Sequence, residues 1–273
     1  MSRMLTLGPL TALSLSPARL LDAAAAAGFD AVGLRLAPGA PGGIAWPLMD
    51  DAALLRETRA AMRATGLTIL DLEMIRIGPQ FDVTAHAGLL AVGAELGAVH
   101  VLVAIDDHDC ARATAHFSQV CEAARSHGLT ADLEFMPWTE APDLATALRI
   151  VEGAAQPNGG VLIDALHVAR AGVTLDALRA VPRNLLHYAQ LCDGPLEAPA
   201  TVEGLIHAAR HERLLPGEGR LPLRELLDAL PADIPLCAEL PHEKRIAELG
   251  AVEWIRRCGQ ACREFIARPE SRP

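Results

Sequence analysis

The heptapeptide ADLEFMP (residues 131–137) places an ionisable side chain, Glu134, inside an apolar run that has the length and composition of a buried β-strand. A lone carboxylate is costly to bury unless a metal ion, a proton or a cation compensates its charge. Three later stretches repeat the pattern, each a short hydrophobic run that ends on oxygen-bearing side chains: residues 161–167, 186–193 and 235–240. We therefore ask whether these oxygens meet in the folded chain.

Similar apolar runs recur along the whole chain and alternate with amphipathic segments. Eight runs are expected to be strands: residues 5–10, 31–36, 68–77, 100–105, 131–137, 161–167, 186–193 and 235–240. Helical patterns fill the intervals, several of them closed by a glycine: residues 17–27, 51–65, 83–96, 110–127, 143–153, 175–180, 201–212, 223–230 and 244–267. Short apolar strands that alternate with amphipathic helices predict a parallel sheet covered by helices.

Eight such units in 273 residues predict an α/β fold, a (β/α)8 TIM barrel that forms a single domain over residues 1–273. The tail from about residue 268 is expected to be frayed. A doubly wound open sheet is the alternative fold. It would require a glycine-rich phosphate turn after an early strand, and the stretch GLRLAPGAPGG (residues 33–43) does not have the GxGxxG spacing.

Composition excludes several classes of partner. The net charge is −10 and no basic stripe is visible, which argues against a nucleic-acid ligand. No uninterrupted apolar run is long enough to span a bilayer, so no membrane partner is expected. The six cysteines form no CxxC pair and are expected to be reduced and buried, as in a cytoplasmic protein. A small molecule is the expected partner, and a homodimer or homotetramer is left open.

Four oxygen-bearing residues fall near the ends of the last four expected strands: Glu134, Asp164, Gln190 and Glu239. In a barrel, the C-terminal ends of the strands converge on the face that carries active sites. A single acidic residue at a strand end is more often a helix cap, but four in succession favour a metal site. Three carboxylates and an amide oxygen suit one hard divalent ion per chain, Mn²⁺ first, with Mg²⁺, Co²⁺ or Zn²⁺ as alternatives.

Several motifs resemble the xylose isomerase-like TIM-barrel superfamily. They are LEFMPW (residues 133–138), DxxH (164–167), QLCD (190–193), PGEG (216–219) and the AEL that contains Glu239. The superfamily includes sugar isomerases and epimerases, hydroxypyruvate isomerase, inosose dehydratase and 3-dehydroshikimate dehydratase. Its endonuclease branch would need more histidines and a DNA-binding surface. The resemblance spans nearly the whole chain and is more specific for the fold and the metal site than for the substrate.

The resemblance also implies roles for individual residues. The metal ligands would be Glu134, Asp164, Gln190 and Glu239, and Glu134 and Glu239 would also be the catalytic acid–base pair. His167 and Arg213 would contact substrate oxygens. Many ketose epimerases have histidine where this chain has Gln190, and glutamine there resembles hydroxypyruvate isomerase and the two dehydratases.

This ligand set predicts a divalent-metal-dependent isomerase or epimerase. It would act on a small sugar, keto-sugar or polyhydroxy carbonyl compound by removing an α-proton, with the metal stabilising the enediolate. A lyase is the first alternative, either a dehydratase or a β-eliminating enzyme on a keto-glycoside, because both reactions share that first step. A barrel that only binds a ligand is less favoured, since all four expected ligands are present.

Four further side chains are candidates for substrate binding, each with a structural alternative. Trp138 stacks on a sugar ring or packs under a loop. Arg35 and Arg76 bind a carboxylate or phosphate, or form salt bridges at the barrel rim. His108 reaches the substrate, or its neighbour Asp109 only caps a helix.

Two other residues and one loop complete the expectations. His187 is expected to begin a strand and to satisfy a buried hydrogen bond, and Asp193 to orient Gln190 or a loop. The connection over residues 194–219 is long for a loop. It is either an active-site lid or a dimer contact.

Overall fold

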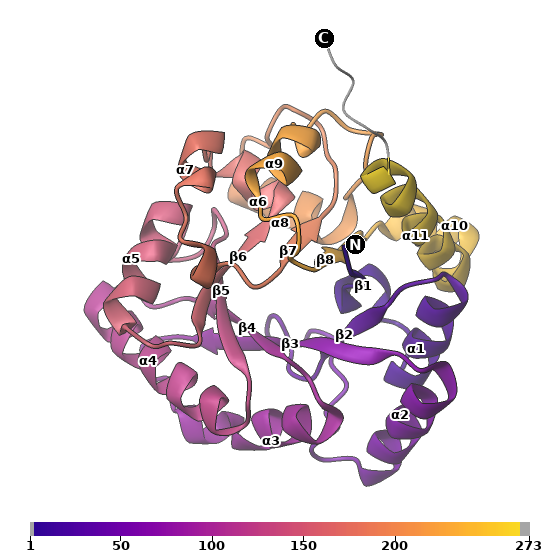
Figure 1. Ribbon diagram of the computed structural model, residues 1–273, viewed down its shortest axis with the longest axis horizontal. Coiled ribbons are helices and arrows are strands. Elements are labelled where there is room, and N and C mark those ends of the chain that lie inside the picture. Colours follow the sequence, from indigo (N-terminus) through magenta and orange to yellow (C-terminus); the bar gives the residue numbers. More distant parts are fainter. Residues whose placement is uncertain (1–2, 268–273) are drawn as a thin grey trace.

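The computed structural model describes residues 3–267, and its strands form one closed parallel barrel in chain order (Figure 1). Each strand pairs with its neighbour in sequence, and the last pairs with the first. The predicted (β/α)8 barrel is confirmed. The expected frayed tail lies outside the described residues. The strands are β1 (Leu5–Leu7), β2 (Ala31–Arg35), β3 (Thr68–Ile77), β4 (His100–Ile105), β5 (Thr130–Glu134), β6 (Gly159–Asp164), β7 (Ala189–Leu191) and β8 (Leu236–Ala238).

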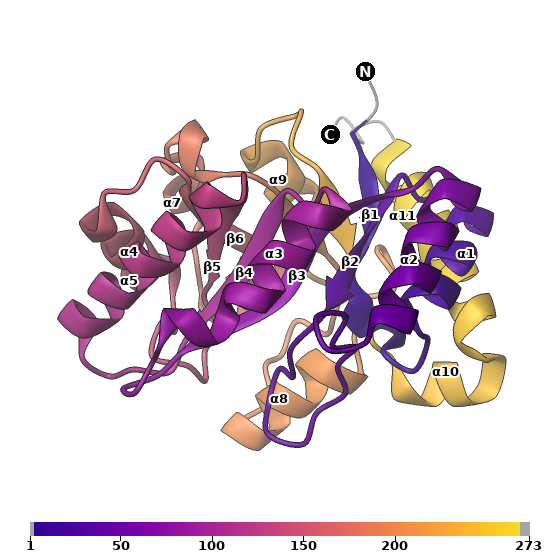
Figure 2. The ribbon, with the colours of Figure 1, turned by 90° about the horizontal axis from the view of Figure 1, so that it is seen from below.

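Helices surround the barrel on its outer face, except α8, which lies at one end of the barrel (Figures 1 and 2). They are α1 (Pro17–Ala26), α2 (Ala52–Thr65), α3 (Ala87–Leu96), α4 (Cys110–Ser126), α5 (Leu144–Ala154), α6 (Ala165–Arg170), α7 (Leu175–Arg179), α8 (Val202–His211), α9 (Leu223–Ala229), α10 (Glu243–Leu249) and α11 (Ala251–Ala267). Three short 3₁₀ segments accompany them: η1 (Pro9–Ala12), η2 (Val83–His86) and η3 (Arg183–Leu185).

The helix ends follow local chemistry. The side chains of Asp51, Asp109 and Asp143 accept hydrogen bonds from backbone N–H groups in the first turns of α2, α4 and α5. Gly66 ends α2 in the left-handed region, at a φ of 75°.

The structure corrects the expected bounds of one helix and one strand. The helix expected over residues 244–267 is divided at Gly250, where φ is 81° and the chain leaves helical geometry. The strand expected over residues 161–167 ends at Asp164 instead, because its carboxylate accepts hydrogen bonds from the backbone N–H groups of Leu166 and His167 and so starts α6.

Apolar side chains fill two regions, the layer between the strands and the helices and the interior of the barrel. The interior cluster includes Leu70, Met74, Leu102, Leu162 and Tyr188. All six cysteines are free thiols, as expected, and five of them are buried, whereas Cys110 is partly exposed. Within residues 3–267 there is no helix long and apolar enough to cross a membrane.

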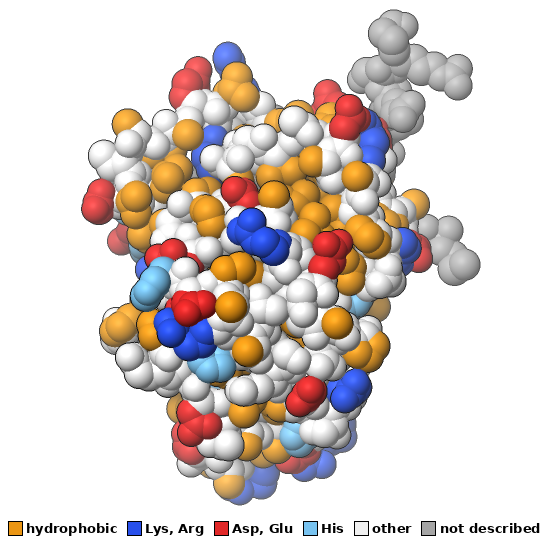
Figure 3. Space-filling view, turned by 90° about the vertical axis from the view of Figure 1, so that its left-hand side faces the viewer, with side chains coloured by type: hydrophobic (Ala, Val, Ile, Leu, Met, Phe, Trp, Pro, Cys, Tyr) orange, Lys and Arg blue, Asp and Glu red, His pale blue; other side chains and the backbone are white. Residues whose placement is uncertain are grey.

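The end of the barrel where the strands terminate is partly covered. Figure 2 shows α8 beside the loop that joins β2 to α2, beyond the C-terminal ends of β1 and β2. On the outer face drawn in Figure 3, basic, acidic and apolar side chains are interspersed. The covered end, rather than this outer face, gathers the predicted site residues.

At the opposite end of the barrel, a buried polar cluster surrounds Asp132 of β5. One carboxylate oxygen lies 2.6 Å from His187 Nδ1, and the other accepts a hydrogen bond of 2.5 Å from the Thr130 hydroxyl. That hydroxyl in turn accepts from Nδ1 of His100 at 2.7 Å. The buried hydrogen bond expected of His187 is confirmed, although His187 precedes β7 rather than beginning it.

Replacing Asp132 by asparagine should lower the pKa of His187 below its ordinary value of 6.5. Burial lowers this pKa, but the hydrogen bond and the charge of Asp132 outweigh it and raise the pKa in the wild type. The His187–Asp132 pair therefore stabilises the folded state fully at pH values below the pKa of His187 in the unfolded chain. This stabilisation is lost as pH rises through the raised pKa of the folded state. The variant should lose more free energy of unfolding at about pH 5.5 than at about pH 9. An NMR titration in which His187 keeps its pKa would contradict this assignment.

Candidate active site

The four predicted metal ligands lie at one end of the barrel, at or just beyond the ends of adjacent strands. Glu134 and Asp164 are the last residues of β5 and β6, Gln190 lies within β7, and Glu239 follows β8. All four are buried, with exposed fractions of 5%, 0%, 1% and 3% in that order. The convergence expected from parallel strands is therefore present.

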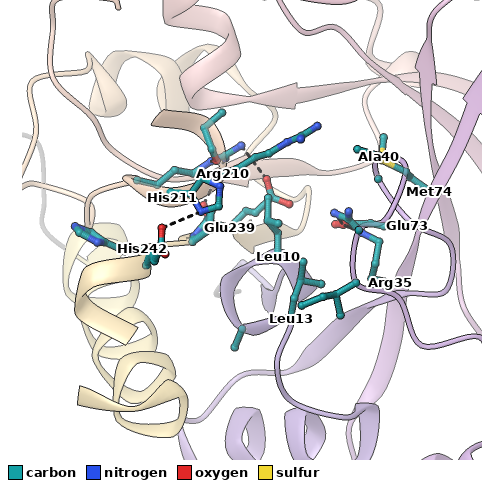
Figure 4. Close-up of a pocket in the computed structure, with 18 of the residues that line it drawn as sticks. Leu10, Leu13, Arg35, Ala40, Glu73, Met74, Arg210, His211, Glu239 and His242 are labelled. Carbon is teal, nitrogen blue, oxygen red and sulfur yellow. Dashed lines mark hydrogen bonds and ion pairs between the residues drawn. The ribbon is translucent and has the colours of Figure 1, made fainter. Parts of the chain in front are cut away.

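A cavity of about 680 Å³ opens at this end, and Figure 4 shows its walls. Side chains from β2 and β3, such as Arg35 and Met74, lie on one side in the figure, and Arg210, His211 and His242 lie on the other. Glu134 and Glu239 both line the cavity. Its volume is in the usual range for small-molecule sites.

Arg213 links two of the carboxylates. Its Nη1 lies 2.5 Å from Oδ2 of Asp164 and its Nη2 lies 3.0 Å from Oε2 of Glu239. Gln190 donates from Nε2 to the other oxygen of Glu239 at 3.1 Å. The residue that the resemblance assigned to the substrate thus holds the predicted metal ligands together in this structure.

The DxxH motif has a local explanation. Because Asp164 caps α6, the chain turns at once into a helix, and His167 falls in its first turn. Its Nε2 lies 3.6 Å from Oε1 of Glu134. The indole of Trp138 meets the imidazole edge to face, with ring centroids 5.1 Å apart, and both rings line the cavity.

The cluster holds more negative charge than its cations balance. Burial raises the pKa of Glu134 well above its ordinary value, and the charges of Glu239 and Asp164 raise it further. Burial also raises the pKa of Glu239, to about 8, although Arg213 opposes the shift. At Asp164 burial acts in the same direction but is outweighed, chiefly by Arg213, so its pKa is lowered. Burial lowers the pKa of His167 to about 4, so its imidazole is neutral at pH 7.

This donor set fits a hard divalent cation. Glu134, Asp164 and His167 offer ligand atoms that all lie within 4.8 Å of one another. Oε1 of Gln190 is buried and has no hydrogen-bond partner among the described residues, so an amide oxygen is available. A cation would also supply the positive charge that the cluster lacks. The group of three neighbouring ligand atoms thus contains His167. Glu239 is connected to it through Arg213, and Gln190 through its hydrogen bond to Glu239.

The other predicted contacts divide into two groups. Arg35 and Arg76 line the cavity, but each is engaged by a carboxylate: Nε of Arg35 donates to Glu73 at 2.8 Å, and Nε of Arg76 donates to Asp106 at 2.6 Å. Both thus form the salt bridges considered as alternatives. His108 is exposed and is not among the residues that line the cavity, and its neighbour Asp109 caps α4, as the alternative expected.

Sequence reasoning undervalued two residues. Glu73 is fully buried and lines the cavity, and its place between Arg35 and Arg76 near the end of a strand was the available signal. Arg210 lines the cavity from α8, and no sequence pattern distinguished it from its basic neighbours.

The long connection is anchored by Asp193. Its carboxylate accepts hydrogen bonds from the backbone N–H groups of Gly194, Gly217, Gly219 and Leu221, at 2.8–3.1 Å. The expected role in orienting a loop is confirmed. The same connection carries residues 209–211 and Arg213 into the wall of the cavity.

Comparison with known proteins places these features in a family. The profile of the family described as xylose isomerase-like TIM barrel matches residues 21–258. A search of curated protein sequences finds no match. One similar solved structure is a xylose isomerase-like TIM barrel/4-hydroxyphenylpyruvate dioxygenase fusion protein, at 20% identity and a TM-score of 0.80. The alignment covers 96% of this chain but 42% of that one, so this chain spans less than half of the fusion protein.

Two further structures match over nearly their full lengths. The IolI protein with a bound zinc atom shares 18% identity at a TM-score of 0.81, covering 98% of this chain and 100% of that one. D-psicose 3-epimerase from Clostridium cellulolyticum H10 shares 14% identity at a TM-score of 0.71, covering 96% and 98%. At these identities the likeness establishes the fold.

Asp193→Asn should loosen the connection that carries Arg213. The variant keeps the shape of the side chain but replaces one acceptor oxygen with an N–H₂ group that faces backbone donors. Amide hydrogen exchange at Gly217, Gly219 and Leu221 should become faster by about tenfold or more. Asp22→Asn, on the exposed side of α1, is the matched control and should leave these amides unchanged. Unchanged protection in Asp193→Asn would remove this carboxylate from its anchoring role.

Metal-stripped protein should become less stable as pH rises from about 5 to about 8. The pKa of Glu239 is raised from 4.5 to about 8 in the folded chain. Its contribution is therefore fully present below the unfolded value and is lost as pH rises through the folded value. Each proton retained only by the folded state changes the free energy of unfolding by about 1.4 kcal/mol per pH unit. Urea unfolding in a chelator should show a shallower fall for Glu239→Gln, and an identical slope would contradict the assignment.

Proposed function

The chain belongs to the xylose isomerase-like TIM barrel family, and we propose that it is a divalent-metal-dependent isomerase or epimerase. Its substrate is a small sugar, keto-sugar or related polyhydroxy carbonyl compound. The observation that carries the proposal is the pair of buried carboxyl groups, Glu134 and Glu239, which line one cavity from β5 and from the end of β8. Burial raises the pKa of each group in the metal-free chain, so both hold a proton more readily than an ordinary glutamate does.

Glu134, Asp164, Gln190 and Glu239 would hold the metal, with His167 adjacent to Glu134. A divalent cation at this position polarises a carbonyl group and the neighbouring hydroxyl, and so favours loss of the α-proton. The bound zinc atom of the structurally similar IolI protein supports a metal in a barrel of this kind, without identifying the metal here.

The two glutamates divide the proton transfers. One carboxylate takes the α-proton of the bound substrate, and the carboxyl group of the other returns a proton. Return to the same carbon from the opposite face gives an epimer. Return to the neighbouring carbon, while the hydroxyl proton passes to the former carbonyl oxygen, gives an aldose–ketose isomer. Epimerisation needs two carboxyl groups on opposite faces of the substrate, and the positions of Glu134 and Glu239 in the cavity wall support such a pair.

Other residues of the cavity orient the substrate and exclude water. The neutral imidazole of His167 donates or accepts a hydrogen bond at a substrate hydroxyl, since a pKa of about 4 keeps it uncharged. Arg213 holds the carboxylates in register and presents its guanidinium close to them. Trp138 and Met136 supply apolar surface beside Glu134 and exclude water from it.

Gln190 is the observation that favours a second candidate, a carbon–oxygen lyase. Glutamine at this position resembles the two dehydratase branches of the superfamily as well as hydroxypyruvate isomerase, and it departs from the histidine of many ketose epimerases. A β-hydroxyl group that leaves after α-proton removal would give a dehydrated ketone from the same cavity.

Wild-type protein loaded with Mn²⁺ and incubated with keto-sugars in D₂O should incorporate deuterium at the α-carbon. Glu239→Gln should slow this exchange by about 10²- to 10⁴-fold, because it removes one partner of the acid–base pair. Glu225→Gln, exposed on α9, is the matched control and should exchange at the wild-type rate. Exchange that survives both Glu239→Gln and a chelator would refute the proposal. Loss of water with a new ultraviolet chromophore would identify the lyase instead.

A further inference from the structure

Arg210 differs from the other arginines that line the cavity. Arg35, Arg76 and Arg213 each form a salt bridge with a carboxylate, as described above. Arg210 also lines the cavity, yet within residues 3–267 its guanidinium has neither a salt bridge nor a hydrogen bond. It is the one arginine of the described cavity wall whose charge the protein leaves without a carboxylate partner.

The surroundings of Arg210 favour an anion from outside the chain. Its pKa is lowered, first by burial of the half-buried side chain and then by the charges of Arg76 and Arg35. Positive charge therefore converges on one part of the cavity from two sides, since Arg35 comes from β2 and Arg210 from α8 (Figure 4). Glu243, an acidic residue of the same wall, lies close to His211 instead, with Oε2 at 3.6 Å from the Nδ1 of that imidazole.

We propose that Arg210 forms a binding subsite for an anionic group of the substrate, a phosphate or a carboxylate, apart from the carboxylate cluster. This inference rests on the proposed function and narrows its substrate class to anionic sugars or sugar acids. Arginine matches both groups because its planar fork donates two parallel hydrogen bonds. An anion here would also relieve the repulsion between Arg210 and the arginines opposite.

The positions of Arg210 and Arg213 define how the substrate would be oriented in the cavity. Arg210 lies three residues before Arg213, which is hydrogen-bonded to the carbonyl of Ala209 and contacts Asp164 and Glu239. The reacting carbonyl would lie toward Glu134 and Glu239, and the anionic group toward Arg210 and the loop after β2. A cavity of about 680 Å³ has room for both ends of a phosphorylated sugar or a sugar acid.

Binding of matched pairs of compounds tests the subsite. Mn²⁺-loaded protein is titrated calorimetrically with D-fructose against D-fructose 6-phosphate, and with D-glucose against D-glucuronate. The anionic member of at least one pair should bind about tenfold or more tightly than its neutral partner, as expected for a charge-assisted hydrogen bond. The pair that shows the preference distinguishes phosphate from carboxylate. The preference should weaken as salt is added, because the side chain is only half-buried.

Variants locate the effect. Arg210→Gln should abolish the preference and leave the affinity for the neutral compound nearly unchanged, whereas Arg210→Lys should retain part of it. Arg220→Gln, at an exposed arginine directly after the same connection, is the matched control and should bind as the wild type does. Equal binding of both members in both pairs, or a preference that persists in Arg210→Gln, would overturn the proposal.

Binding and α-proton exchange are measured separately, so the subsite and the reaction can fail separately. A protein that shows no α-proton exchange but keeps an Arg210-dependent preference would refute the proposed function and leave the anion subsite in place.

Discussion

Burial of carboxylates at the ends of β5, β6 and β8 is the constraint on which the site depends. Glu134, Asp164 and Glu239 are all nearly inaccessible to water, and together they exceed the positive charge that Arg213 provides. Such a cluster is stable only if protons or a further cation neutralise it. In the metal-free chain the raised pKa values of Glu134 and Glu239 favour protonation, which removes negative charge. A bound divalent ion would neutralise the cluster instead.

The rest of this end of the barrel supports Arg213. The guanidinium reaches the cluster because Asp193 anchors the connection after β7 through four backbone N–H groups. On the opposite side, Asp164 both accepts a charge-assisted contact from Arg213 and caps α6, which places His167 beside Glu134. The side chain of Asp164 therefore links β6, α6 and the long connection that carries Arg213. Substrate specificity would then come from the outer wall, where α8 and the loop after β2 face one another.

The sequence predicted the barrel and the cluster because both depend on local pattern. Alternating apolar strands and amphipathic helices determine the fold class, and parallel strands bring their ends together. The ion pairs were less predictable: Arg35 and Arg76 could be read as ligands for an anion or as salt bridges, and only the packing of Glu73 and Asp106 beside them decides. At the start of α4 the cap by Asp109 follows local pattern and was among the alternatives, whereas the exposure of His108 depends on the packing of the loop before it. Arg210 depends on what the fold leaves unpaired, which no local pattern encodes.

Proton release on metal binding tests the central claim most directly. Metal-stripped protein is titrated with Mn²⁺ at about pH 7 in buffers of different ionisation enthalpy, which separates the heat of binding from that of proton transfer. We expect one site per chain and the release of about one proton or more for each ion bound, because Glu134 and Glu239 must ionise to become ligands. Absence of binding, or binding without proton release, would contradict it.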